Sequence, residues 1–205
     1  SAYAKNDNGK IVIIEKSSSE LKQIANYVGA EYLVSEENIS AYFNEIVPEF
    51  VRRNKLKHQY INDGKTEKEI YELMKTNKPI YIFIADIGAF MNEIYHPENN
   101  ISPMNPFFEN IFEKGFLHNI FFFSCVNTEE SSTLAGYRSY NIFTSYKTGV
   151  HLGGNISAQR IFTFQNIGFN DLSKSMKKGM GLVPSADDES ICKKIVIPLF
   201  GGLGK

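Results

Sequence analysis

The sequence predicts an α/β fold in which a mostly parallel central sheet is flanked by helices on both faces. Three largely apolar runs, at Lys10–Ile14, Pro79–Ala85 and His118–Val126, are typical of strands buried on both faces. Stretches with apolar residues at helical spacing separate these runs. Because parallel neighbours need a crossover connection, usually a helix, this alternation indicates a doubly wound sheet.

Composition narrows the classes of protein to consider. The chain has 205 residues, of which 42% are hydrophobic, and we expect one domain, or part of one, over 1–205. The formal net charge of -1 argues against a nucleic-acid partner, because phosphate contacts need clustered Lys and Arg. Cys125 and Cys192 fit a reduced, cytosolic protein. No apolar run reaches the ~20 residues that span a bilayer, so we expect a soluble chain.

The elements of the first two thirds carry recognisable end signals. Ser35 is expected to cap a long helix that Pro48 kinks or splits, and Thr66 with Glu69 forms a capping box. A short strand is expected at Glu31–Val34. Four helices are expected: one between Ser17–Ser19 and Gly29, one at about Glu36–Leu56, one from Thr66 to about Met74, and one at Phe107–Lys114. Asn54–Lys65 is a polar segment, and Asn92–Pro106 is expected to be a loop.

The last third is rich in glycine and loops and is expected to close the edge of the sheet. One or two helical turns are expected at Leu134–Tyr140. Short strands are expected at Asn141–Phe143, Arg160–Phe164, Gly181–Val183 and Lys193–Ile197.

Asp86 follows the clearest strand and should lie at the carboxyl edge of the sheet, where open α/β folds bind ligands. There it could hold Mg²⁺, as the acid after such a strand does in nucleotide hydrolases. Taken alone, a helix cap for Gly88–Asn92 is the better interpretation. The next residue is Ile87, which cannot accept a proton, so no hydrolytic base stands at that position.

Ser124 and Asn127 end the following strand. In nucleotide hydrolases this place hosts a polar residue that contacts the terminal phosphate, although a loop cap is the simpler interpretation. Arg52 and Arg53 are expected to be solvated charges, or to pair with a neighbouring subunit.

A phosphate-binding loop of the form G-x-x-x-x-G-K-[ST] does not occur in the sequence. Gly201–Lys205 resembles one superficially, but no Ser or Thr follows its lysine, and we expect a flexible tail. Gly149–Gly154 is glycine-rich and is expected to form a tight turn beside a strand. The four histidines lack metal-ligand spacing.

The order of these segments resembles FtsK/SpoIIIE-type motor domains, and most of all the last ATPase domain of type VIIb secretion coupling proteins, the EssC/YukB family. The resemblance covers nearly the whole chain. It rests on Lys10–Lys16 with Ser19–Leu21, Ser35–Arg53, Pro79–Asp86, Gly115–Ser124, Gly149–Gly154 with Gln159 and Arg160, Lys178–Gly181, and Lys194–Leu199.

The resemblance implies a RecA-like P-loop NTPase fold whose phosphate-loop part lies upstream or has been lost. It also implies a domain at the cytoplasmic face of a membrane-anchored, Gram-positive secretion motor. Expected partners are secreted WXG100-type and effector proteins, adjacent ATPase domains and a homo-oligomer of the full-length protein. ATP and Mg²⁺, with Asp86 as the metal ligand and Ser124 and Asn127 at the nucleotide, are expected only for the full-length protein.

Three functions stay open at this point. The first is a degenerate motor domain that acts through protein contacts, for which Phe107–Phe116 is a candidate surface unless it is a buried helix. The second is a competent Mg-ATPase whose phosphate loop lies upstream. The third is a receiver-like or flavodoxin-like module, against which the single acid Glu15 counts, because a receiver needs an acidic pair after its first strand.

Overall fold

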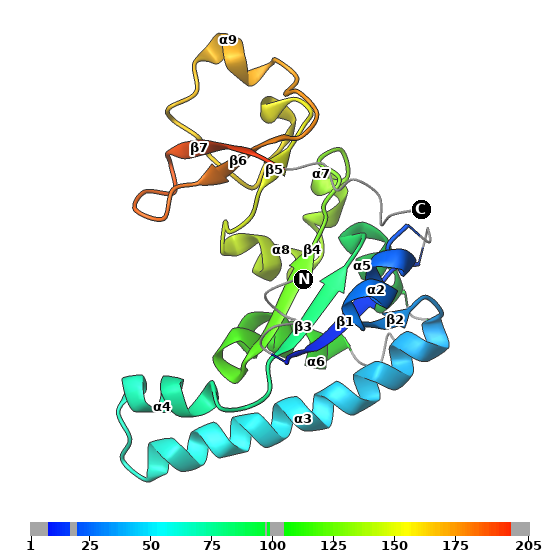
Figure 1. The fold of residues 1–205 in the computed structure, drawn as a ribbon, viewed down its shortest axis with the longest axis vertical. Helices are drawn as coiled ribbons and strands as arrows, with labels where there is room; N and C mark the ends of the chain where they lie inside the picture. The colour runs from blue at the N-terminus through cyan, green and yellow to red at the C-terminus, as the bar shows by residue number, and fades with distance from the viewer. Residues whose placement is uncertain (1–7, 17–19, 97, 99–104, 198–205) are drawn as a thin grey trace. The chain divides into compact units, whose positions relative to one another are not determined.

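The computed structural model of the chain describes residues 8–16, 20–96, 98 and 105–197 (Figure 1). These residues form two compact units, one up to Val126 and the other from Asn127. The expectation of one domain over 1–205 stays a prediction. Within the described residues, no helix combines the length and the apolar character that crossing a membrane requires.

A four-stranded parallel sheet organises the first unit, with strand order β2-β1-β3-β4 (Figure 1). This confirms the predicted fold class. The strands are β1 (Lys10–Ile14), β2 (Glu31–Leu33), β3 (Ile80–Ile84) and β4 (Ile120–Ser124). The helices are α2 (Lys22–Val28), α3 (Glu36–Asn62), α4 (Glu67–Met74), α5 (Ile87–Tyr95) and α6 (Asn105–Lys114), with a 3₁₀ helix, η2, at Gly115–His118.

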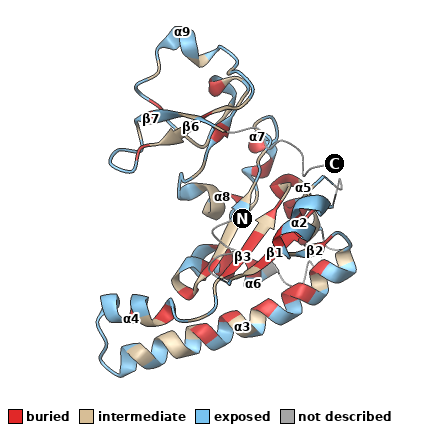
Figure 2. Ribbon diagram, in the orientation of Figure 1, coloured by how far each residue is buried: buried red, intermediate tan, exposed pale blue. Residues whose placement is uncertain are grey.

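The core of this unit lies between the sheet and α3, α5 and α6, where buried positions recur along α3 (Figure 2). Phe43 of α3 meets Phe108 of α6 with ring centroids 3.8 Å apart. Phe90 of α5 lies 5.4 Å from Phe108. All three rings are at most 2% exposed, so aromatic burial joins three helices that are distant in sequence.

The helix α3 differs from its prediction. It runs unbroken through Pro48 and continues to Asn62. A proline inside a helix loses one hydrogen bond, but Ile46 and Phe50 on either side are buried, and their packing outweighs that loss. The helix ends at a turn in which Gly64 has a φ of 73°.

Several other predictions have clear outcomes in this unit. Ser35 caps α3, and Thr66 with Glu69 forms the capping box of α4. The predicted loop Asn92–Pro106 is wrong at both ends, because α5 extends to Tyr95 and α6 begins at Asn105. Ser17–Ser19, which precede the first expected helix, lie outside the described residues.

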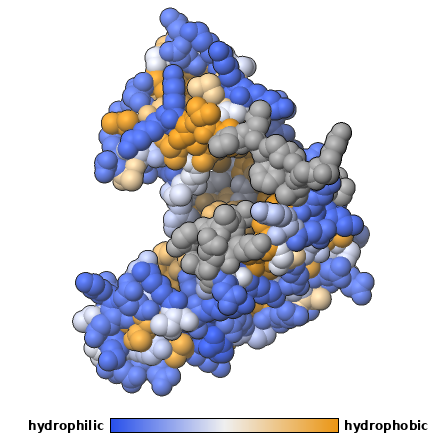
Figure 3. Space-filling model, viewed as in Figure 1, coloured by the Kyte–Doolittle hydropathy of each residue, from blue (hydrophilic) through white to orange (hydrophobic). Residues whose placement is uncertain are grey.

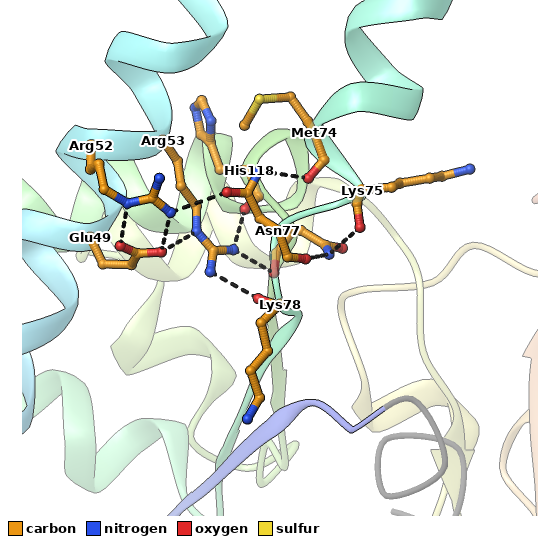
Figure 4. Close-up of polar contacts among 9 residues, drawn as sticks. Glu49, Arg52, Arg53, Met74, Lys75, Asn77, Lys78 and His118 are labelled. Carbon is orange, nitrogen blue, oxygen red and sulfur yellow. Dashed lines mark hydrogen bonds and ion pairs between the residues drawn. The ribbon is translucent and has the colours of Figure 1, made fainter.

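Arg53 ties α3 to the amino edge of the sheet (Figure 4). Its guanidinium donates to the carbonyl oxygens of His118, at 2.7 Å, and Lys78, at 2.8 Å, which lie just before β4 and β3. Its Nε donates to Glu49 Oε1 at 2.7 Å. Arg53 is 2% exposed, so the expectation of a solvated charge is wrong for this residue. A buried guanidinium is tolerated because each of its three nitrogens finds an acceptor.

Two side chains at this edge have shifted pKa values. Hydrogen bonds from Arg52, and then from Arg53, lower the pKa of the Glu49 carboxyl to about 2 despite its partial burial. Burial, with the charges of Lys57 and Arg53 nearby, lowers the pKa of His118 to about 4. The His118 ring, which meets Phe50 edge-on at 4.9 Å, is therefore neutral at pH 7.

A three-stranded antiparallel sheet of order β5-β6-β7 organises the second unit. Apolar side chains gather over β6 in the space-filling view (Figure 3). The core joins Ile156, Phe164, Leu182 and Cys192. The elements are α7 (Ser131–Leu134), α8 (Arg138–Ser145), β5 (His151–Leu152), η3 (Ile156–Ala158), α9 (Phe169–Leu172), β6 (Met180–Pro184) and β7 (Cys192–Val196).

This unit confirms the strands predicted at Gly181–Val183 and Lys193–Ile197 and corrects the rest. The strands form their own sheet and do not extend the parallel one. Asn141–Phe143 is helical, within α8. Arg160–Phe164 is irregular, because the Gln159 Oε1 atom accepts the N–H groups of Ile161 and Phe162 that a strand ladder would use.

Replacing Arg53 with Met removes the guanidinium and keeps most of the aliphatic bulk. Because the buried His118 carbonyl and the part-buried Lys78 carbonyl then lose their donor, we expect the free energy of unfolding to fall by about 3 kcal/mol. Urea denaturation at pH 7 measures this. Arg52→Met is the matched control, since Arg52 binds the same Glu49 but its side chain is 56% exposed; its expected cost is below about 1 kcal/mol. Equal losses in the two variants would contradict the buried role of Arg53.

Candidate functional site

Three polar side chains lie at the carboxyl edge of the parallel sheet. Glu15 follows β1, Asp86 comes two residues after the end of β3, and Ser124 ends β4. The register aligns Ile14 with Ile84, and Ile84 with Ser124. Because the strands are parallel, the three positions share one edge, as the sequence predicts for Asp86 and Ser124.

Asp86 is the N-cap of α5. Its backbone is extended, with φ -139° and ψ 106°, and its Oδ1 atom accepts the N–H of Ala89 at 3.1 Å. A carboxylate in this position satisfies one of the orphan N–H groups of the first turn and faces the positive end of the helix dipole. The capping interpretation drawn from the sequence is therefore confirmed.

Ile87 begins α5 and points into the core. Its side chain is 0% exposed, and its N–H donates to the Cys125 carbonyl at 3.2 Å, which links α5 to the segment after β4. This position is thus a packing position in the present fold. A carboxylate there would be buried among apolar groups, away from any water it could activate.

Glu15 and Lys16, after β1, are engaged in internal contacts that sequence reasoning did not assign. The Glu15 Oε2 atom accepts the Tyr32 hydroxyl at 2.6 Å and the Leu21 N–H at 3.1 Å, and Glu15 is 3% exposed. Partial burial and this bond raise the pKa of Tyr32 to about 12. Lys16 pairs with Glu93 of α5. The sequence signal for these contacts is the acid–lysine pair, Glu15 and Lys16, directly after β1.

Ser124 and Asn127 also bond to nearby groups. The Ser124 hydroxyl donates to the Ile84 carbonyl at 2.7 Å, which ties β4 to β3. Asn127 belongs to the second unit, where its Oδ1 atom accepts the Glu129 N–H at 3.1 Å in the turn before α7. The loop-cap interpretation describes the bonds of Asn127, and a role for either residue at a nucleotide stays a prediction.

The candidate ligands at this edge are engaged within the fold, and the position after Asp86 offers no group to orient a water. Of the candidate ligands, Asp86 caps a helix, Ser124 donates to a main-chain carbonyl, and position 87 carries a buried aliphatic group. The described residues include no cluster of three or more His, Cys, Asp or Glu side chains arranged to hold a metal ion.

The two glycine-rich segments have different outcomes. Gly153 and Gly154 have φ values of 60° and 61° in a tight turn directly after β5, as predicted. Only the three-residue η3 follows this turn, so it offers no helix of useful length to a phosphate. Gly201–Lys205 lies outside the described residues.

Replacing Ile87 with Glu tests whether position 87 is a core position. Because the new carboxylate would be buried without a partner, we expect the free energy of unfolding to fall by about 3 kcal/mol or more. Ile87→Met is the control of similar volume, with an expected loss below about 1.5 kcal/mol. Both are measured by urea denaturation at pH 7, and a Glu variant as stable as the Met variant would show that position 87 opens to water.

Comparison with known proteins gives matches in structure alone. No protein-family model and no curated protein matches the sequence. The cytoplasmic domain of EssC superposes with a TM-score of 0.69 and 16% identity, over 92% of this chain and 33% of that chain. EssC ATPases 2 and 3 from Geobacillus thermodenitrificans give a TM-score of 0.64 and 16% identity, over 92% and 31%. The chain thus spans about a third of each matched EssC chain, and it has the α/β fold of an EssC-like domain.

Proposed function

We propose that this chain is a degenerate ATPase-fold domain of a type VII secretion motor. In this proposal it contributes to substrate recognition and to the regulation of export through protein contacts, with weak or no ATP hydrolysis of its own. The parent protein is membrane-anchored, and this domain lies at the cytoplasmic face of the membrane. Its partners are the adjacent ATPase domains of the same chain and secreted WXG100-type and effector proteins.

One observation carries the proposal: the position after Asp86 is filled by a fully buried isoleucine. Hydrolysis in this type of site needs a group that orients the attacking water, beside an acid that holds Mg²⁺. Here Ile87 packs in the core, and Asp86 caps the helix that Ile87 begins. The strand end therefore serves the fold, and the likeness to EssC supports descent from a motor domain.

The candidate contact surface from the sequence, Phe107–Phe116, is an amphipathic segment with one face buried in the core. Phe108 and Phe112 pack in the core at 1% and 6% exposure, as the simpler interpretation of the sequence held. Phe107 and Phe116 are 45% and 46% exposed at either end. These two rings are the apolar surface that α6 and η2 offer to a partner protein.

The two alternative functions gain no support from the first unit. A competent Mg-ATPase would need its phosphate loop upstream and an acid other than residue 87 as the base. A receiver-like module would need an accessible acidic pocket, whereas Glu15 is buried and bonded to Tyr32.

ATP hydrolysis by the chain extended upstream tests the proposal. We expect Asp86→Asn to leave the rate of hydrolysis unchanged, because asparagine caps helices about as well as aspartate and no metal is lost. The rate is measured as phosphate release with Mg²⁺ at saturating ATP. Asp171→Asn, at an exposed position on α9 of the second unit, is the control. A rate that Asp86→Asn abolishes would refute the degenerate assignment and establish the competent ATPase.

A further inference from the structure

Charge is divided along the helix α3. Its first part carries Glu36, Glu37, Glu45 and Glu49 and no Lys or Arg, whereas residues 52–62 carry four Lys and Arg, one His and no acid. Acids at the start of a helix complement its dipole, and basic groups do so only within the last turn. The last turn of α3 holds no basic residue. The helix dipole therefore does not account for the basic part of this helix.

Several of these basic groups have no acidic partner. The two arginines share the Glu49 carboxylate. Lys55, Lys57 and His58 form no hydrogen bond or ion pair with any residue that the structure describes. Lys55 and His58 are exposed, and Lys57 is half-buried. Intramolecular pairing therefore does not explain these three groups either.

A fourth unpaired basic group, Lys114, comes from α6. It ends α6 four residues before His118 and is exposed. The His118 ring packs against Phe50 of α3, with centroids 4.9 Å apart (Figure 4). Lys57 lies seven residues after Phe50, on the same face of the helix two turns later. We call Lys55, Lys57, His58 and Lys114 the basic surface.

His118 adds an independent observation at this place. Its side chain is 1% exposed, and its Nδ1 atom has no hydrogen-bond partner within the described part of the chain. Buried polar atoms normally have a partner. Every charged group that shifts the pKa of His118 is basic, with Lys57 first and Lys114 among the others. The potential around this ring is therefore positive, and a bound anion would offset it.

We propose that the basic surface binds a short acidic segment of a protein, whose carboxylates pair with Lys57 and Lys114 above His118. A nucleic acid fits less well, because its binding typically uses many phosphate contacts and this chain has a net charge of -1. The choice of a protein ligand rests in part on the proposed function, in which the domain acts through protein contacts. Binding is measured without nucleotide, so its outcome is independent of ATP hydrolysis.

Fluorescence anisotropy of labelled hexa-aspartate, titrated with the 205-residue chain at pH 7 and low salt, tests this. We expect saturable binding that Lys57→Glu combined with Lys114→Glu weakens roughly tenfold or more, because two attractive charges become repulsive. Lys193→Glu combined with Lys194→Glu is the control, since it changes the net charge equally at two exposed lysines of β7. No binding, or equal weakening in both double variants, overturns the proposal.

Hexathymidylate, titrated in the same way, separates a protein ligand from a nucleic acid. We expect it to bind more weakly than hexa-aspartate. Tighter binding of hexathymidylate that the Lys57 and Lys114 changes abolish would assign the basic surface to nucleic acid and overturn the choice of a protein ligand.

The His118 ring gives a second readout on the unmodified chain. The pKa of this ring is lowered to about 4, so the ring is mostly neutral at pH 5, where aspartate carboxyls stay ionised. Bound carboxylates should raise that pKa, and NMR signals of the ring at pH 5 should move toward their protonated positions. Sodium chloride at the same ionic strength is the control. Peptide binding that moves these signals no more than the salt does would place the ligand elsewhere and overturn the assignment.

Discussion

The buried guanidinium of Arg53 fixes the first unit at the amino edge of its sheet. It joins Glu49, on the same helix, to the chain just before β3 and just before β4. Asn119, with φ 59°, adds a bond from its side chain to the Asn77 carbonyl at 2.7 Å. Because both strands start from this fixed point and run parallel, Asp86 and Ser124 reach the opposite edge together.

The polar side chains at the carboxyl edge of the sheet form hydrogen bonds within the protein. Glu15 accepts hydrogen bonds from the Tyr32 hydroxyl and from the N–H of Leu21, just before α2. Asp86 caps α5, and the Ser124 hydroxyl donates to the Ile84 carbonyl of β3. In each case a group placed where α/β folds bind ligands satisfies the protein's own backbone or side chains. The polar groups of this edge are thus engaged within the fold, and the position after Asp86 holds a buried aliphatic side chain.

The sequence predicted the parallel sheet and the capping residues because these depend on local patterns, such as β-branched runs, Ser35 and the Thr66–Glu69 box. It could not predict that α3 passes through Pro48, since burial of Ile46 and Phe50 overrides the local cost. Nor could it place Arg53, whose acceptors lie 25 and 65 residues away. At the site, Asp86 and Ile87 were identified from the sequence, whereas the contacts of Glu15 and Lys16 needed the structure.

The central claim is that Asp86 serves the fold and does not hold a metal. The most direct measurement is a crystal structure of the chain extended upstream, grown with Mg²⁺ and a non-hydrolysable ATP analogue. The account predicts that Asp86 Oδ1 stays on the Ala89 N–H and that no Mg²⁺ binds to its carboxylate. Electron density for Mg²⁺ coordinated by Asp86, directly or through water, beside the nucleotide phosphates would contradict it.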